Sequence, residues 1–440
     1  MRERIAVLGG GMVGTLFSIL LVKRGFRVEV FEKRPDPRKH HTSEGRSINL
    51  ALSHRGIRAL KMAEVYDEIK PVLLPMYGRK IHTEKGIDFH PYGQSDQFIN
   101  SVSRHELNAA LIEQAERSGA SFHFEHLISE VDPKKGSITI PSGISHHFDF
   151  LVGADGALSL LRKTFEKRNA SFHIDAEKLA HGYKELTIAP RGNEFAIDPK
   201  ALHIWPRNNY MLIALPNPDK SFTCTLFLAN KGDTSFENLK SPDQIRKFIE
   251  ASFPDIPGLI PDVVDQFLSN PTSYLQTIRA SPWVYEKSLL LGDAAHAIVP
   301  FYGQGMNAGF EDCRILIELL ESNNYDWNKS VHAFQDQRKQ DTDAIAELAL
   351  QNFLEMRAHV IDEAYLKRKE LEARLFAAFP DEWLPLYSMV TFSDTPYHEA
   401  LRLGRLQKEA ISSIDSAYDP KTVDLEGLIN TFKRLKQAPR

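Results

Sequence analysis

Residues 4–14 read RIAVLGGGMVG and residues 27–32 read RVEVFE. The apolar run Arg4–Leu8 predicts a buried strand, and the apolar side chains after the glycines recur at helical spacing until Gly25. The alternation in RVEVFE predicts a second strand. The chain therefore begins with the strand, glycine turn, helix and strand that open a doubly wound parallel sheet.

The glycines of this turn follow the pattern GxGxxG. We expect Gly9 to permit the tight turn, Gly11 to let a pyrophosphate approach the backbone, and Gly14 to let the helix lie close to the sheet. The first helical turn would then direct its free N–H groups at the phosphates. Glu32, at the end of the second strand, can accept hydrogen bonds from ribose hydroxyls. Together these residues predict a dinucleotide site, although GxGxxG alone also occurs in ordinary glycine-rich turns.

Length and composition are those of a globular protein with two or three structural units. Of the 440 residues, 42% are hydrophobic and 25% charged, which excludes a disordered, collagen-like or coiled-coil chain. The net charge of -4 offers no basic field for nucleic acid. Cys224 and Cys313 form no CxxC pair, so no zinc ribbon is expected. We expect a soluble, cytoplasmic protein with no metal and no membrane anchor.

Helical and strand patterns of apolar residues alternate along the rest of the chain. Helices are expected at residues 55–66, 104–118 and 304–321, and long helices within 331–379, which contains neither glycine nor proline. Single strands are expected at Ser121–Glu130, Ser137–Ile140, Phe148–Val152 and Ser288–Leu291. Between about 181 and 230 the pattern predicts antiparallel strands, at Gly182–Ile188, Leu202–Trp205, Tyr210–Leu215 and Phe222–Leu228. We interpret this segment as a second layer, inserted between pieces of the first domain.

A second glycine motif indicates which dinucleotide to expect. Gly292-Asp293 follows the strand Ser288–Leu291, and GQGMN follows at 303–307. An Asp at a strand end can hydrogen-bond a polyol chain, and a helix beginning near residue 304 directs its amides at an anionic ring edge. A reduced flavin carries such charge and a nicotinamide does not, so the motif favours FAD. Taken singly, Asp293 could instead be a helix N-cap beside a glycine loop.

The combination of GxGxxG, GADG at 153–156 and Gly292-Asp293 resembles the group A flavoprotein monooxygenases, the aromatic hydroxylases related to 4-hydroxybenzoate hydroxylase. The chain has no second GxGxxG, no CxxxxC pair of the disulfide reductases and no WxWxI of the flavin halogenases. The resemblance implies an α/β, two-domain fold with a Rossmann-like FAD-binding domain. Its parts would be an FAD-binding domain (1–72, 100–180 and 275–325), an inserted antiparallel β-sheet substrate domain (73–99 and 181–274) and a C-terminal helical region (326–440).

Longer segments narrow the resemblance to the kynurenine 3-monooxygenases, from the N-terminus to about residue 408. They are GRSINLALSHRG (45–56), PYG (91–93), SVSRHELN (101–108), LHIWPRN (202–208), LIALPN (212–217), KSFTCTLF (220–227), LGDAAHAIVPFYGQGMNAGFEDC (291–313), EMRAHV (355–360) and MVTF (389–392). The resemblance implies bound FAD, with NADPH and O2 as cosubstrates. It also implies hydroxylation of L-kynurenine to 3-hydroxy-L-kynurenine through a flavin C4a-hydroperoxide, in tryptophan degradation.

In that chemistry the amine of the substrate activates its own ring, so no protein group is expected as acid or base. The protein must exclude water, and Pro300, Phe301 and Phe227 are expected to supply dry walls. His296 is expected to be structural.

The same resemblance implies a substrate site. Arg79 and Tyr92 match the arginine and tyrosine that hold the substrate carboxylate, and Asn352 and Tyr397 complete the set. A guanidinium grips a carboxylate through two parallel charge-assisted hydrogen bonds. The alternatives are a solvated Arg79 and a half-buried core Tyr397. Animal members read PMRAR where this chain reads PMYGR at 75–79, and they carry an apolar anchoring tail where this chain ends KRLKQAPR.

For FAD, the expected contacts are Gly9, Gly11, Val13, Gly14, Glu32, Arg34, Ala51, Arg104, Ile128, Asp155, Asp293, Gly305, Met306 and Asn307. NADPH phosphates could meet the basic residues near the second strand, or these residues could form a solvated loop: Lys33, Arg34, Arg38, Lys39 and Arg46. Two other functions stay open, namely hydroxylation of a different carboxylated aromatic and a non-catalytic FAD-fold binding protein. We expect a monomer or a homodimer.

Overall fold

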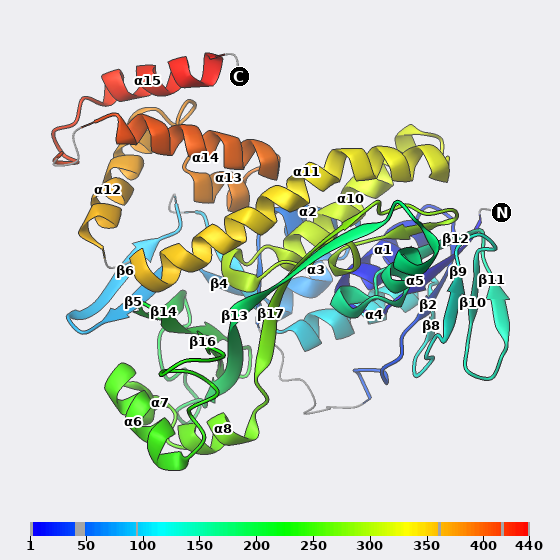
Figure 1. The fold of residues 1–440 in the computed structure, drawn as a ribbon, viewed down its shortest axis with the longest axis horizontal. Coiled ribbons are helices and arrows are strands. Elements are labelled where there is room, and N and C mark those ends of the chain that lie inside the picture. The colour runs from blue at the N-terminus through cyan, green and yellow to red at the C-terminus, as the bar shows by residue number, and fades with distance from the viewer. Residues whose placement is uncertain (1–2, 40–48, 94–95, 360–361, 415–417, 439–440) are drawn as a thin grey trace.

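The structure, a computed structural model, describes residues 3–39, 49–93, 96–359, 362–414 and 418–438. Figure 1 shows the N-terminal elements on the right, a twisted sheet at the lower left and the orange to red C-terminal helices above that sheet. The long helix α11 (Trp327–Leu354) runs along all three parts. Arg46 lies outside the described residues.

The first layer is a five-stranded parallel sheet. Its strands are β1 (Arg4–Leu8), β2 (Arg27–Phe31), β8 (Ser121–His123), β12 (Phe150–Gly153) and β18 (Ser288–Leu290). Their spatial order is β18-β12-β1-β2-β8, so the first strand lies in the centre and the order reverses between β1 and β12. Ligands of such sheets bind outside the carboxyl ends of the strands at this switch point. The predicted doubly wound sheet is confirmed.

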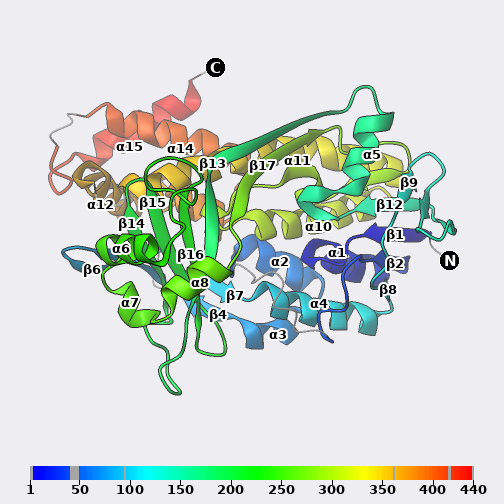
Figure 2. The ribbon, with the colours of Figure 1, turned by 60° about the horizontal axis from the view of Figure 1, so that its bottom comes forward.

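Helices pack beside this sheet, as Figure 2 shows for α1 and α4. α1 (Met12–Val22) contacts α4 (Arg104–Ser118) and α10 (Gly305–Ser322), whereas α5 (Leu160–Arg168) contacts β12 and α9 (Asp293–His296). The helix predicted over 55–66 is split into α2 (His54–Met62) and α3 (Tyr66–Ile69), because Glu64 between them has a positive φ of 54°. Short helical turns lie at Lys70–Val72, Gly156–Leu158 and Pro300–Tyr302.

The prediction of one strand over 121–130 is wrong. β8 ends at His123, and Glu125 then adopts a left-handed conformation, with φ of 59°, that breaks the ladder. Glu130 begins β9 (Glu130–Asp132), which belongs to a separate antiparallel sheet with β10 (Ser137–Thr139) and β11 (Ser145–His147). The alternating pattern continued through the turn without a partner strand. Another small sheet joins β3 (Leu50–Leu52), β7 (Ile99–Val102) and β4 (Leu74–Met76).

The second layer is a seven-stranded sheet in the order β17-β13-β16-β15-β14-β5-β6. The strands are β5 (Gly78–Thr83), β6 (Gly86–Pro91), β13 (His173–Ile188), β14 (Ala201–Arg207), β15 (Tyr210–Pro216), β16 (Phe222–Ala229) and β17 (Ser273–Ser281). All neighbours are antiparallel except β14 and β5. β13 starts well before its predicted beginning at Gly182, because it pairs with β17 from His173 onward. These two strands cross the expected domain boundaries near 180 and 275, and the division into three parts stays a prediction.

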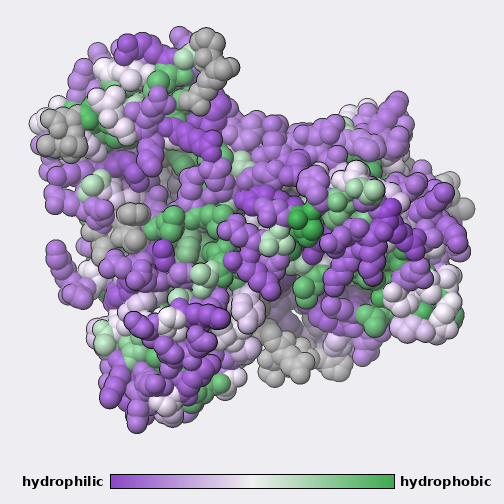
Figure 3. Space-filling model, in the orientation of Figure 1, coloured by the Kyte–Doolittle hydropathy of each residue, from purple (hydrophilic) through white to green (hydrophobic). Residues whose placement is uncertain are grey.

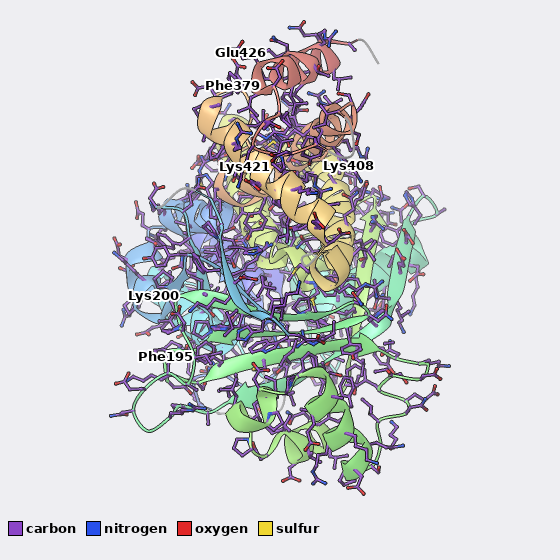
Figure 4. All side chains as sticks on the ribbon, turned by 90° about the vertical axis from the view of Figure 1, so that its left-hand side faces the viewer. Phe195, Lys200, Phe379, Lys408, Lys421 and Glu426 are labelled. Atoms are coloured by element: carbon purple, nitrogen blue, oxygen red, sulfur yellow. The ribbon has the colours of Figure 1, made fainter. Side chains whose placement is uncertain are left out.

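Helices flank the seven-stranded sheet on both sides (Figure 4). Below it lie α6 (Pro242–Ser252), α7 (Ile256–Leu259) and α8 (Val263–Ser269); above it lie the C-terminal helices, marked by Phe379 and Lys408. The long helices predicted within 331–379 are confirmed as the C-terminal part of α11, a π-helical turn (Glu355–His359) and α12 (Glu363–Ala378). α13 (Leu386–Phe392), α14 (Tyr397–Ser412) and α15 (Leu425–Gln437) follow. Across the described ranges, no helix is both long and apolar enough to traverse a bilayer.

Candidate functional site

The glycine turn between β1 and α1 leaves room only where a ligand would approach. A Cβ on Gly9, whose φ is 108°, would lie 2.5 Å from the carbonyl oxygen of Ala154. A Cβ on Gly14 would lie 2.2 Å from the carbonyl oxygen of Gly9. A Cβ on Gly11, the residue before α1, would meet no atom within 4 Å. Gly9 and Gly14 therefore have no room for a side chain, because protein atoms lie against them. The space in front of the helix N-terminus, at Gly11, is free.

Glu32 follows directly after β2 and is 6% exposed. Its Oε2 accepts a hydrogen bond from the N–H of Gly10 at 2.9 Å, and its Oε1 accepts from the backbone N–H and Nε of Arg34 at 3.0 and 2.9 Å. Burial alone would raise the pKa of Glu32, but the Arg34 guanidinium and these N–H donors hold the pKa below its ordinary value. Ribose hydroxyls reaching Glu32 would therefore compete with Arg34.

Asp155 lies between β12 and α5, beside the glycine turn. Its Oδ2 accepts hydrogen bonds from the N–H groups of Leu160 and Leu161, at 2.6 and 3.3 Å, whereas its buried Oδ1 has no partner among the residues that the structure describes. Burial raises the pKa of this carboxyl. Arg104 is exposed at the start of α4, and Ile128 packs at the edge of the core around the parallel sheet.

The loop after β18 brings a carboxylate and a helix N-terminus together. Asp293 is exposed at the start of α9, and α10 begins at Gly305. The Val13 side chain holds α1 against this region, because a Cβ on Gly292 would lie 3.2 Å from Val13. Met306, in the first turn of α10, is buried. This edge of the sheet therefore offers free N–H groups from two helices and an accessible carboxylate.

Asn307 joins the start of α10 to the segment at β3. Its Nδ2 donates to the carbonyl oxygens of Ala51 and Gly303, both at 2.8 Å, and its Oδ1 accepts from the N–H of Ser53 at 2.9 Å. A Cβ on Gly303 would lie 3.0 Å from the Cβ of Ala51. Two segments distant in sequence, 51–53 and 303–307, therefore meet with little space between their backbones. The donors, the open turn and the exposed carboxylate fit a flavin dinucleotide.

Arg79 on β5 and Tyr92, directly after the end of β6, lie together, as predicted for a carboxylate site. The Cζ of Arg79 lies 5.5 Å from the Tyr92 ring centroid and 4.6 Å from that of Tyr387 on α13. The buried Nε of Arg79 and hydroxyl of Tyr92 have no hydrogen-bond partner among the described residues. Burial would lower the pKa of Arg79, but the surrounding phenols favour the cation and raise the pKa above its ordinary value. Two buried donors therefore lack an acceptor.

The other two predicted substrate residues lie on the C-terminal helices. Asn352 on α11 donates from Nδ2 to the carbonyl oxygen of Phe301 at 2.7 Å and is 7% exposed. Tyr397 on α14 is fully buried, and its hydroxyl donates to Oε1 of Gln304 at 3.0 Å. Tyr397 thus contacts the turn at 303–307, and a protein acceptor already occupies its hydroxyl.

Sequence reasoning missed Tyr387, whose ring lies between two others. It stacks on Tyr92 at 5.5 Å and 12°, and on Tyr302 at 5.7 Å and 18°. The quoted segment MVTF begins two residues after Tyr387, so the signal lay close by in the sequence. Glu355 and Tyr365 line a cavity of about 620 Å³ that lies among the helices α11 to α14. Figure 3 shows hydrophobic side chains gathered between the C-terminal helices, at the upper left, and the part formed by the seven-stranded sheet with α6 to α8, at the lower left.

A buried charge network, also missed, ties these helices to the parallel-sheet layer. The Nε of Arg338 on α11 donates to Oδ1 of Asp312 at 2.9 Å, and Oδ2 of Asp312 lies 2.6 Å from Nε2 of His296. Glu311 Oε1 accepts from Nη1 of Arg55 at 2.6 Å. Burial would raise the pKa of Asp312, but the neighbouring His296 and Arg338 hold the pKa below its ordinary value. His296 is 4% exposed, inside this network.

Two of the basic residues considered for NADPH, Arg34 and Arg38, are paired within the protein. Arg34 binds Glu32, and Arg38 binds Asp36 at 2.7 Å and Glu116 at 2.5 Å. Lys33 and Lys39 are exposed. The pairing leaves less free positive charge in this segment than the sequence indicated.

The FAD binding domain family matches residues 2–324. A kynurenine 3-monooxygenase of Cytophaga hutchinsonii is 47% identical over 423 residues, which cover 94% of each chain. The chain belongs to the kynurenine 3-monooxygenase family. The family member of Sus scrofa is 41% identical and covers 94% of this chain and 88% of its own. The family resemblance and the FAD-binding domain expected from the sequence are confirmed.

A solved structure outside this family has the same fold. The tetrameric form of 2-methyl-3-hydroxypyridine-5-carboxylic acid oxygenase superposes with a TM-score of 0.68 and covers 83% of this chain and 95% of its own. Its sequence identity is 20%, so this likeness concerns the fold alone. The predicted α/β fold with an inserted sheet and C-terminal helices is confirmed.

Proposed function

We propose that this protein converts L-kynurenine, NADPH, a proton and O2 into 3-hydroxy-L-kynurenine, NADP⁺ and water, with FAD as its bound cofactor. The observation that carries the proposal is a pair of buried donors, Nε of Arg79 and the hydroxyl of Tyr92, that have no acceptor within the described part of the chain. Donors left unpaired in this way cost free energy, and a ligand carboxylate would satisfy both. The relatives named for kynurenine support this choice of carboxylated substrate.

The FAD site is proposed at the switch point of the parallel sheet. When bound, FAD supplies the transfer of electrons from NADPH to O2 and the activation of oxygen. The chain holds the pyrophosphate in front of Gly11 and the start of α1, where N–H groups and the helix dipole favour negative charge. Asp293 would accept hydrogen bonds from the ribityl hydroxyls, and the first turn of α10 would face the ring.

Aromatic side chains beside this site would keep water away from the reacting oxygen. The ring of Phe301 stacks on Phe353 at 4.0 Å and lies 4.9 Å from Phe227. Phe301 is 6% exposed. The amine of kynurenine donates electrons to the ring carbon beside it, so this proposal assigns no protein acid or base. Asn352 holds the backbone of Phe301 in place.

We further propose a cytoplasmic location and a monomer or homodimer. Cys224 and Cys313 are buried free thiols, which suits a reducing compartment.

Oxidation of NADPH by the purified holoprotein in air tests the proposed function. We expect L-kynurenine to stimulate NADPH oxidation well above the rate without substrate, and 4-hydroxybenzoate to leave that rate unchanged. Stimulation by the hydroxybenzoate alone would instead indicate a hydroxylase of another carboxylated aromatic. A colourless protein that takes up no FAD would indicate a binding protein on the same scaffold.

A further inference from the structure

Arg357 is a basic residue that neither the predicted NADPH contacts nor the proposed function uses. It belongs to the segment EMRAHV and lies in the π-helical turn that follows α11. This turn contacts β14 of the seven-stranded sheet. Arg34 and Arg38, which the sequence offered for the phosphates of NADPH, bind carboxylates of the protein itself. Arg357 has no carboxylate partner among the described residues, so its charge is available to a ligand.

The guanidinium of Arg357 has more N–H donors than its surroundings accept. Its Nη1 lies 3.3 Å from Nε2 of His181, and the same Nε2 lies 3.0 Å from the carbonyl oxygen of Asn209. A ring nitrogen that donates its proton to a carbonyl cannot also accept from a guanidinium. The buried Nε of Arg357 has no acceptor within the described ranges of the chain. Unpaired donors on a positive charge are the groups that an anion would satisfy.

The positive charge of Arg357 is not balanced by its neighbours. Burial lowers the pKa of Arg357, and no carboxylate in the described part of the chain raises it again. Burial and the adjacent guanidinium lower the pKa of His181, so this imidazole is neutral at pH 7. A partly buried cation without a counterion costs free energy in the ligand-free protein, and a bound phosphate would recover part of that cost.

Two ring contacts connect Arg357 to the turn that would face the flavin. The Cζ of Arg357 lies 5.0 Å from the ring centroid of Phe353, and this ring stacks on Phe301 at 4.0 Å. Phe301 lies two residues before the turn at 303–307. The guanidinium therefore lies one aromatic ring beyond Phe301. In a nicotinamide cosubstrate the diphosphate lies one ribose beyond the reactive ring, which is a similar separation.

We propose that Arg357 binds the diphosphate of NADPH and thereby brings the nicotinamide beside the flavin. This inference rests on the proposed function and names the docking group for its reductant. A guanidinium donates two parallel hydrogen bonds to one phosphate group. The diphosphate is common to NADPH and NADH. Loss of the guanidinium should therefore weaken both nucleotides and leave the binding of kynurenine at Arg79 unchanged.

The test follows flavin reduction in the FAD-loaded full chain, with kynurenine bound and oxygen removed. Arg357→Ala should lower the second-order rate constant of reduction by about tenfold or more, with NADPH and with NADH alike. Calorimetric titration with NADP⁺ makes the same comparison without turnover, and the Kd should rise by about tenfold or more. Arg357→Lys keeps the charge without the fork, so it should lose only about threefold.

Arg405→Ala is the matched control, because it removes an equal charge that Glu347 already pairs at 2.6 Å. It should leave every constant within about twofold of wild type. The Kd of kynurenine in Arg357→Ala, followed by flavin absorbance, should also stay within about twofold. If Arg357→Ala does not retain FAD, Arg357→Gln replaces it with the same expectations.

Unchanged reduction constants in Arg357→Ala would overturn the inference. So would a loss confined to NADPH, which would indicate the 2′-phosphate, or a loss confined to kynurenine, which would indicate the substrate acid. The two proposals fail in different ways. A wild-type protein that does not hydroxylate kynurenine removes the proposed function, whereas an active wild type beside an Arg357→Ala variant that is reduced equally fast removes the role of Arg357 alone.

Discussion

Replacing Arg79 by alanine should remove most of the affinity for kynurenine. The guanidinium is the buried cation of the proposed acid site, and its Nε has no partner among the described residues. Loss of one member of a buried, hydrogen-bonded charge pair costs about 2–5 kcal/mol. The hydroxyl of Tyr92 remains as a second donor, so we expect about 2–4 kcal/mol here. Since each 1.4 kcal/mol is a factor of ten, the Kd should rise by about 30-fold to 700-fold.

The assay is titration of the FAD-loaded variant with L-kynurenine, followed by flavin absorbance. FAD content should be unchanged, because Arg79 lies on β5 and not among the elements proposed to hold the cofactor. Lys80→Ala is the control, since Lys80 is the next cation on the same strand and pairs with Asp198 at 2.7 Å. It should leave the Kd within about twofold. A wild-type Kd in Arg79→Ala would refute the reasoning and take Arg79 out of the acid site.

Three further changes test other parts of the account. Gly14→Ala should lower the melting temperature of the FAD-free protein, because its Cβ would lie 2.2 Å from a backbone oxygen. Gly11→Ala should leave that melting temperature unchanged and weaken FAD binding, measured by ultrafiltration. Equal melting temperatures for the two variants would contradict this. Phe301→Ala should lower the 3-hydroxykynurenine formed per NADPH and raise H2O2, since water enters; an unchanged yield would remove Phe301 from the dry wall. Asp312→Asn should lower the free energy of unfolding at pH 7 by about 1.5–3 kcal/mol, since buried Arg338 loses one of its three carboxylate partners and keeps Glu311 and Asp341. Because the folded pKa of Asp312 is depressed, this difference from wild type should persist above its ordinary value of 3.8 and shrink as pH falls below it. Denaturant titrations at several pH values measure this difference. If Asp312 played no such part, the difference in unfolding free energy between variant and wild type would not change with pH.

The sequence predicted best what depends on neighbouring residues. The first strand, glycine turn and helix follow from residues 4–25, because the constraints on Gly9 and Gly14 are local to the turn and the strands beside it. The antiparallel layer was also predicted from local alternation. The strand over 121–130 was wrong because alternation alone does not show whether a partner strand exists, and Glu125 ends the ladder.

The assembled site depended on contacts between distant segments. The resemblance named Arg79, but not the aromatic ring of Tyr387 that supports it from 308 residues further along the chain. Likewise, nothing in the sequence indicated that Asn307 would bind the backbone at Ala51. Such pairs are set by how the layers pack, and periodicity along one segment carries no information about them.

The central claim is that the carboxylate of kynurenine is held while its ring receives one oxygen atom from O2. Mass spectrometry of the product formed from L-kynurenine and NADPH under oxygen-18 gas tests this claim most directly. The account predicts 3-hydroxykynurenine that carries a single oxygen-18 atom, in an amount close to the NADPH consumed. Unmodified kynurenine beside labelled hydrogen peroxide, or a product without the label, would contradict it.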